Sequence, residues 1–237
     1  MAAVEVKNLV KNYGTIEAVK DISFSVNKGE IFGLIGPNGA GKTTTLRILS
    51  TLLTITSGSI KIMNHDLSKE PGEIRKIISY LPEDAGAYKN LTGKGYLEFI
   101  ANFFEKNNPQ QMVSRGIEIA DLGERIKDKV DTYSKGMMRK LLVGRALMTN
   151  PKLAILDEPT SGLDVNNAQE IRRLIKNTAN QGTTILLSSH NMLEVEFLCD
   201  RIVLISDGII VEKGTPEYLM KKHDAKNIEE VFTKVVK

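Results

Sequence analysis

Short apolar runs rich in Val and Ile recur along the chain and are typical of β-strands. In the run at 22–26, Ile22, Phe24 and Val26 alternate with polar residues, which predicts a half-exposed antiparallel strand. The run at 31–35 is continuously apolar, which predicts a central strand buried on both faces. Further strands are expected at 4–10, 60–63, 77–81, 153–156, 184–187, 202–205 and 209–211. The pattern therefore indicates an α/β core.

Between residues 80 and 150 the apolar positions change to helical spacing. One expected helix face gathers Leu97, Ile100, Ala101 and Phe104, and another gathers Ile117, Ala120 and Leu122. The Asp207-Gly208 pair predicts a hairpin, and 227–236 fits a short amphipathic helix. We therefore expect a single domain over 1–237. Its parts are a core at about 1–82 and 151–215, a helical subdomain at about 83–150 and a helical tail at about 216–237.

Composition excludes several classes of protein. The 237 residues are 41% hydrophobic and 26% charged, as in an ordinary globular protein rather than a disordered, collagen-like or disulfide-rich one. A formal charge of +3 gives no strong field of one sign, so nucleic acid is not expected as a partner. Cys199 is the single cysteine and is expected to be a small buried side chain. No run approaches the roughly 18 apolar residues of a membrane span, and a cytoplasmic chain is expected.

The segment after the buried strand at 31–35 is a full match to G-x-x-x-x-G-K-[ST], the phosphate-binding loop pattern. It consists of Gly36, Pro37, Asn38, Gly39, Ala40, Gly41, Lys42 and Thr43. Its glycines let the backbone approach phosphate oxygens, and the helix that opens at Gly41 and is expected to continue from Thr44 to Leu52 aims unpaired N–H groups at them. Lys42 supplies a positive charge for the β- and γ-phosphates, and the Thr43 hydroxyl suits Mg²⁺.

Two acids at the end of a buried strand add the second half of a hydrolytic site. Asp157 and Glu158 follow the run at 153–156. Asp157 is placed to hold Mg²⁺ through water, and Glu158 can orient or deprotonate the attacking water. A phosphate loop alone is shared by kinases, GTPases and ATPases, but the chain has no Asn-Lys-x-Asp motif for reading guanine.

Other positions fall, in chain order, where one family of ATPases carries functional residues. They are Tyr13, the segment Tyr133-Ser134-Lys135-Gly136-Met137, the segment Ser161-Gly162-Leu163-Asp164, and His190. Together with the phosphate loop and the acidic pair, they make the chain resemble, over nearly its whole length, the nucleotide-binding subunit of an ATP-binding cassette (ABC) transporter. The resemblance implies a P-loop core with a mixed, mainly parallel sheet flanked by helices. An antiparallel β-subdomain and an inserted α-helical subdomain would complete this fold.

The same resemblance implies the roles of individual residues. Tyr13 would stack on adenine and His190 would hydrogen-bond the γ-phosphate. By itself, a tyrosine at this place is more often a packing or turn residue, and a histidine is just as easily a helix-start or core residue. The signature residues Ser134, Lys135, Gly136 and Met137, with Asp164 of the D-loop, would face the ATP held by a second copy. In the signature, Lys135 replaces a glycine of the usual Leu-Ser-Gly-Gly-Gln and so changes which backbone angles are allowed.

At the Q-loop, Glu83 stands where the family has glutamine. A carboxylate is ionised at pH 7, so it should attract Mg²⁺ and repel the γ-phosphate. Each term is on the order of 4 kcal/mol at ~4 Å and an effective dielectric constant near 20, and the sign of their sum does not follow from sequence. We expect Glu83 to join Thr43 and Asp157 in sensing the metal.

The resemblance finally implies a function and partners. ATP and Mg²⁺ would be the cofactors, with Lys42, Glu158 and His190 acting in hydrolysis. A second copy would close over two ATP molecules, and separate multi-span membrane subunits would hold the chain on the cytoplasmic face of the membrane. The variants at 80–83 and 133–137 resemble the exporter branch. The alternative is a soluble ABC-type ATPase acting on ribosomes or nucleic acid, and the cargo is not encoded here.

Overall fold

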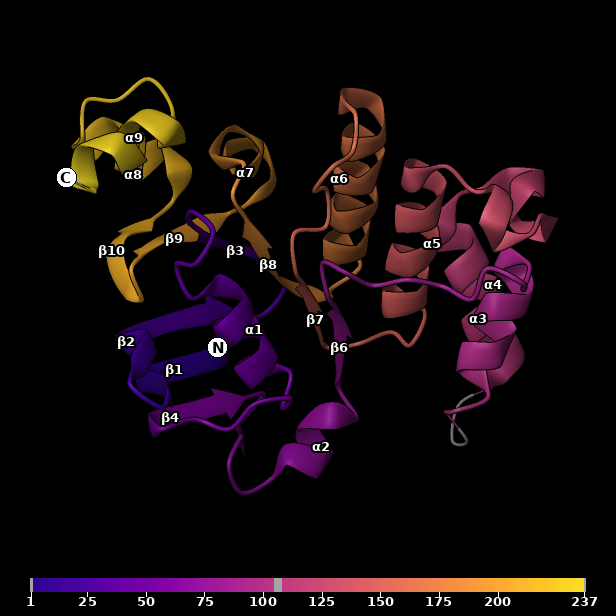
Figure 1. Cartoon of the computed structure of the whole chain (residues 1–237), viewed down its shortest axis with the longest axis horizontal. Coiled ribbons are helices and arrows are strands. Elements are labelled where there is room, and N and C mark those ends of the chain that lie inside the picture. Colours follow the sequence, from indigo (N-terminus) through magenta and orange to yellow (C-terminus); the bar gives the residue numbers. More distant parts are fainter. Residues whose placement is uncertain (1, 105–107, 237) are drawn as a thin grey trace.

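The structure, a computed structural model, describes residues 2–104 and 108–236 (Figure 1). Its larger sheet has the strand order β10-β9-β3-β8-β7-β6, in which all neighbouring pairs are parallel except that of β10 with β9. These strands are β3 (Ile31–Ile35), β6 (Ile78–Leu81), β7 (Leu153–Leu156), β8 (Thr184–Ser189), β9 (Arg201–Ser206) and β10 (Ile209–Gly214). All five residues of β3 are buried between β8 and β9, which confirms the expected central strand.

The smaller sheet is antiparallel, with the order β2-β1-β4-β5. Its strands are β1 (Ala2–Tyr13), β2 (Ile16–Asn27), β4 (Ser57–Ile62) and β5 (His65–Asp66). Ile22, Phe24 and Val26 are buried on one face of β2, as their alternation predicts. The Phe24 ring stacks on Phe32 of β3 with centroids 5.5 Å apart, so the two sheets share a hydrophobic core.

Helices occupy both faces of the larger sheet and the two ends of the molecule (Figure 1). The α-helices are α1 (Lys42–Leu49), α2 (Pro71–Arg75), α3 (Gly93–Ala101), α4 (Pro109–Ala120), α5 (Lys135–Leu147), α6 (Val165–Asn180), α7 (Met192–Leu198), α8 (Pro216–Lys222) and α9 (Ile228–Val235). Two 3₁₀ turns, η1 (Gly123–Lys127) and η2 (Val130–Thr132), precede α5. Helices α3, α4 and α5 form a group at one end, and α8 and α9 lie at the other.

Several expected boundaries were wrong. The helix after the phosphate loop starts at Lys42 with Gly41 as its N-cap, as expected, but it ends at Leu49 and not at residue 52, because Thr51 adopts a left-handed backbone and Leu52 points to solvent. Phe104 lies beyond α3, where the last turn tightens into i→i−3 hydrogen bonds.

Leu122 likewise lies outside α4, since Asp121 ends that helix in the left-handed region at φ 47°. The Asp207-Gly208 hairpin is confirmed, with both residues at positive φ, and Cys199 is buried. Within the described ranges, no helix is long and apolar enough to cross a bilayer.

Candidate active site

The glycine loop joins β3 to α1, and strands β9 and β2 pack closely against it. A Cβ on Gly36 would collide with the carbonyl oxygen of Ile205 on β9. Gly41 caps α1 at φ 98°, and a Cβ there would lie 2.5 Å from the Ala18 carbonyl oxygen on β2. Both positions therefore need glycine, and the turn leaves the first N–H groups of α1 without intrahelical partners.

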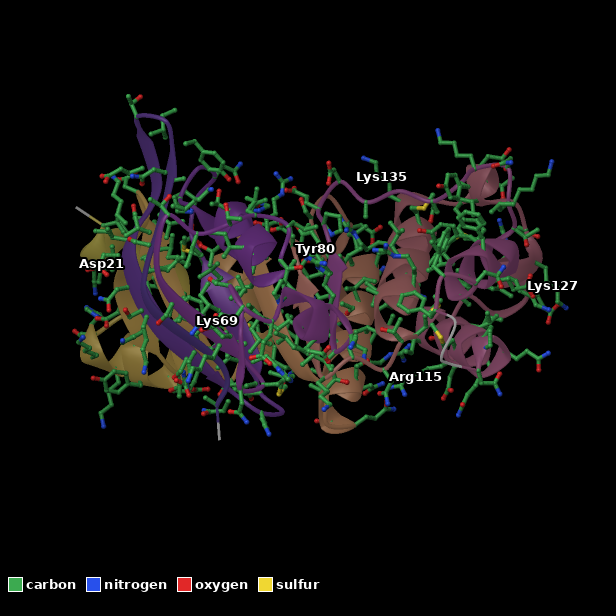
Figure 2. The ribbon with its side chains drawn as sticks, turned by 90° about the horizontal axis from the view of Figure 1, so that it is seen from below. Asp21, Lys69, Tyr80, Arg115, Lys127 and Lys135 are labelled. Carbon is green, nitrogen blue, oxygen red and sulfur yellow. The ribbon has the colours of Figure 1, made fainter. Side chains whose placement is uncertain are left out.

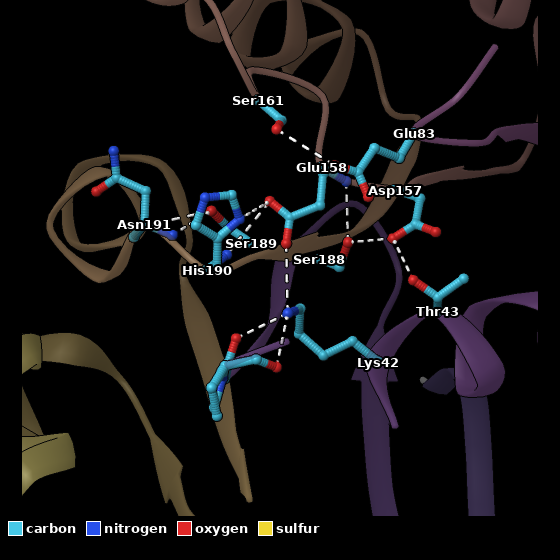
Figure 3. Close-up of polar contacts among 12 residues, drawn as sticks. Lys42, Thr43, Glu83, Asp157, Glu158, Ser161, Ser188, Ser189, His190 and Asn191 are labelled. Atoms are coloured by element: carbon cyan, nitrogen blue, oxygen red, sulfur yellow. Dashed lines mark hydrogen bonds and ion pairs between the residues drawn. The ribbon is translucent and has the colours of Figure 1, made fainter. Parts of the chain in front are cut away.

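Lys42 is folded back into this loop (Figure 3). Its Nζ donates to the carbonyl oxygens of Gly36 at 2.7 Å and Pro37 at 3.2 Å. The same ammonium lies 3.3 Å from Glu158 Oε1, and the two side chains are only 6% and 5% exposed. A buried lysine is thus held by groups that an incoming phosphate could replace.

Asp157 lies at the carboxyl edge of the parallel strands, at the centre of a set of oxygen atoms (Figure 3). Its Oδ1 accepts from Ser188 Oγ at 2.5 Å and from Thr43 Oγ1 at 3.3 Å. Its Oδ2 accepts from the Tyr80 hydroxyl at 3.4 Å. Burial, followed by the charge of Asp157, raises the pKa of Tyr80 to about 12, so this phenol remains a donor at neutral pH. Thr43 and Asp157 are brought together as the sequence predicts.

Glu158 has an unusual backbone for its residue type, with φ at 47°. Its N–H donates to Ser188 Oγ at 2.9 Å, and its Oε2 lies 2.8 Å from His190 Nδ1. Left-handed backbone is disfavoured for a residue with a Cβ, and such strain clusters at functional sites. Glu158 thus stands between Lys42 on one side and the half-exposed ring of His190 on the other.

The signature residues lie at the start of α5. Ser134 caps the helix, its Oγ accepting from the Met137 N–H at 3.2 Å. Lys135 is exposed at the surface (Figure 2) and belongs to the helix, with no positive φ. Position 135 therefore does not require the backbone freedom of glycine, and a lysine fits there without strain.

Gly136 of the signature segment and Asp164 of the D-loop both contact Asn167 of α6. A Cβ on Gly136 would collide with the Asn167 amide, so α5 and α6 approach closely there. Asp164 caps α6 by accepting from the Asn167 N–H at 3.0 Å, and this hydrogen bond holds the pKa of Asp164 below its usual value. Asn167 thus joins the beginnings of both helices, a connection that sequence reasoning missed.

Tyr13 and Glu83 lie apart from this network. Tyr13 is 44% exposed at the end of β1, with Lys11 Nζ 5.1 Å from its ring centroid. Glu83 follows β6, and its Oε1 accepts from Ser161 Oγ at 3.3 Å. The hydrogen-bonded network therefore unites Lys42, Thr43, Asp157, Glu158 and His190, while the predicted roles of Tyr13 and Glu83 depend on a bound nucleotide.

A glycine loop with a buried lysine, next to two acids at the ends of parallel strands, defines a P-loop nucleoside triphosphatase. The family model described as ABC transporter matches residues 19–161, more than half of the chain. The chain belongs to the ABC transporter family, as an ATP-binding subunit that hydrolyses ATP.

Relatives and a solved structure agree with this assignment. The chain is 39% identical over 214 residues to the linearmycin resistance ATP-binding protein LnrL of Bacillus subtilis, covering 90% of this chain and 69% of LnrL. It is 34% identical to the lipopolysaccharide export system ATP-binding protein LptB of Haemophilus influenzae, covering 96% and 97% of the two chains.

A solved dimeric ATP-binding cassette, in a post-hydrolysis state bound to ADP and Pi, superimposes with a TM-score of 0.79 at 25% identity. That match covers 90% of this chain and 98% of the cassette. The predicted α/β fold with its P-loop core is confirmed.

Proposed function

We propose that the chain hydrolyses MgATP with Glu158 as general base, and the observation that carries this proposal is the placement of Glu158. The carboxylate is buried, and within the described ranges its Oε1 accepts no hydrogen bond and is held only by the ion pair with Lys42 at 3.3 Å. His190 Nδ1 orients the other oxygen. When ATP enters, Lys42 exchanges Glu158 and the loop carbonyls for phosphate oxygens. Glu158 Oε1 is then available to take a proton from the attacking water.

The residues present also fit a magnesium ion. Thr43 Oγ1 and Asp157 Oδ1 are oxygen ligands 3.3 Å apart beside the phosphate loop, the donor type that Mg²⁺ prefers. The ion would neutralise charge that develops on the phosphates. Thr43 would hold it directly and Asp157 through water, while Glu83 reports its presence to the helical subdomain at about 83–150.

The test is Glu158→Gln, which keeps the shape of the side chain and removes its basicity. General-base assistance contributes roughly 10² to 10⁴ in rate, so ATP turnover should fall by at least about 100-fold while nucleotide affinity stays within a few-fold of the parent. Phosphate release and equilibrium ATP binding measure the two quantities. Glu217→Gln, on the exposed face of α8, is the matched control with unchanged turnover. Turnover near the parental rate in Glu158→Gln would rule out the assignment.

We further propose that two copies close around two ATP molecules. Ser134 and Asp164 are exposed at the adjoining starts of α5 and α6, where N–H groups and the positive helix ends can meet the γ-phosphate of a facing copy. Lys135 and Gly136 supply the following N–H groups, and Met137, whose N–H donates to Ser134 Oγ, completes the turn that presents them. The likeness to a dimeric cassette supports this arrangement. Hydrolysis would then reopen the pair.

The closing and reopening of the two copies is proposed to drive separate multi-span membrane subunits, in the direction of export. The names of LptB, from an export system, and LnrL, a resistance protein, support this direction. An exposed aromatic series offers a contact surface for such a partner. In it, the ring centroid of Phe99 lies 5.2 Å from that of Tyr88 and 5.2 Å from that of Phe103. The chain would then lie on the cytoplasmic face of the membrane through its partners.

A further inference from the structure

Arg139 is a charged side chain buried in the helical part of the molecule, only 8% exposed. It comes from α5, two residues after the signature segment, and lines an open cleft of about 360 Å³ together with Ser134 and Ser161. Its Nη2 donates to the main-chain oxygen of Glu83 at 3.1 Å. Its Nη1 is also buried, and in the described part of the chain it makes no hydrogen bond.

The charges around Arg139 are the carboxylates of the candidate site. Burial lowers the pKa of Arg139, and the carboxylates of Glu83, Asp157 and Glu158 oppose that shift. An arginine keeps its proton at neutral pH even so. Burying a cation is costly unless opposite charge compensates it, so these acids are the reason that the guanidinium is tolerated there.

Glu83 carries the opposite charge to Arg139 and lies beside it, because its main-chain oxygen accepts the Arg139 hydrogen bond. Within the described ranges its carboxylate receives one hydrogen bond, from the neutral Ser161 hydroxyl. Among the residues that the structure describes, no cation is bonded directly to this carboxylate, whereas Arg139 Nη1 has a donor without a partner on a guanidinium already hydrogen-bonded to the main chain of Glu83. A γ-phosphate arriving beside Glu83 would meet uncompensated negative charge unless Arg139 offset it.

We propose that Arg139 is a positioning residue that neutralises Glu83, so that a carboxylate can stand beside the γ-phosphate of MgATP. The hydrogen bond through Nη2 fixes the guanidinium at the Glu83 loop, and the delocalised charge of that guanidinium compensates the carboxylate. Because Arg139 belongs to α5, the same side chain connects this loop to the helix that begins at Ser134. The inference rests on the proposed place of Glu83 beside the nucleotide.

The test is equilibrium binding of ADP and of the non-hydrolysable ATP analogue AMP-PNP, both with Mg²⁺, to four proteins. These are the parent, Glu83→Gln, Arg139→Gln and the double variant. We expect Arg139→Gln to weaken AMP-PNP binding about tenfold, or ~1.4 kcal/mol, while ADP, which lacks the γ-phosphate, changes less than twofold. In the double variant the repelling charge is gone, and AMP-PNP affinity should return to within about threefold of the parent.

Two control variants separate this role from a merely structural one. Arg145→Gln removes another arginine of α5 that donates to a carbonyl oxygen, that of Tyr80 at 3.4 Å, and should leave the AMP-PNP to ADP affinity ratio unchanged. Arg139→Lys keeps the charge and should retain most of that ratio. Thermal unfolding of each variant verifies that it is folded. A structural role alone predicts equal loss for both nucleotides and no recovery in the double variant, which would overturn the proposal.

The outcomes also separate this inference from the proposed function. If Glu83→Gln alters the Mg²⁺ dependence of AMP-PNP binding but Arg139→Gln leaves the affinity ratio at the parental value, only the role of Arg139 is wrong. If Glu83→Gln changes neither the affinity nor its Mg²⁺ dependence, Glu83 does not stand beside the nucleotide and both proposals fall.

Discussion

At the scale of single residues, Ser188 holds the two acids of the site in place. It is completely buried, donates to Asp157 and accepts from the Glu158 N–H. Ser188→Ala leaves that buried N–H without a partner, which costs about 1–3 kcal/mol in the free energy of unfolding. Urea unfolding measures this loss. Hydrolysis should fall as well, because the left-handed backbone of Glu158 loses its anchor.

Ser50→Ala is the matched control for this loss. Ser50 is also buried and donates to the Leu46 carbonyl oxygen, but that oxygen keeps its bond from the Ser50 N–H. We therefore expect less than about 1 kcal/mol from the control. Equal losses in the two serine variants would show that Ser188 has no special part in ordering the site.

The same residues show why sequence reveals some of a site and not the rest. Lys42, Thr43, Asp157 and Glu158 were predicted because each belongs to a short contiguous motif with its own chemistry. Ser188 lies 30 positions from Glu158 and reaches it only because β7 and β8 are neighbours in the sheet. No local pattern reports such a pairing.

At the scale of elements, the start of α5 combines a structural and a proposed functional task in Ser134. Ser134→Ala should cost about 1 kcal/mol through the lost cap, and it should also weaken an ATP-held dimer if this hydroxyl faces the partner's nucleotide. We expect the dimer dissociation constant, measured by light scattering with MgATP in a Glu158→Gln background, to rise about tenfold, or ~1.4 kcal/mol.

Thr92→Ala separates the two tasks. Thr92 caps α3 by accepting from the Gly95 N–H at 3.0 Å, so its loss should reduce stability by a similar amount. It lies outside the signature segment and should leave the dimer dissociation constant unchanged. A dimer weakened equally by both variants would mean that Ser134 acts only as a cap.

Element boundaries were the weaker part of the sequence prediction for a physical reason. The helical spacing placed Leu97 and Ile117 correctly in α3 and α4, but Phe104 and Leu122 continue the same period beyond the helix ends. Those ends are decided by backbone conformation at single residues, such as the left-handed Asp121, and not by the periodicity of apolar side chains.

At the scale of the whole molecule, the buried and alternating strands were predictable, because burial on one or both faces determines the apolar pattern of each strand separately. The order β10-β9-β3-β8-β7-β6 was not, since it depends on crossovers that join distant segments. This order is what brings the glycine loop after β3 to the acids after β7, with β8 between them.

The membrane partner is also a property of the whole molecule, and it tests the transporter proposal against a soluble ABC-type ATPase. Glu158→Gln should remain in its ATP-bound form, so a tagged copy purified with MgATP from detergent-solubilised source cells should keep its partner. We expect a multi-span membrane protein at a stoichiometric ratio, identified by mass spectrometry. The same purification without nucleotide, and with Lys42→Ala, which removes the loop cation, serves as control. Recovery of ribosomal proteins or nucleic acid instead would contradict transport while leaving the chemistry of Glu158 unchanged.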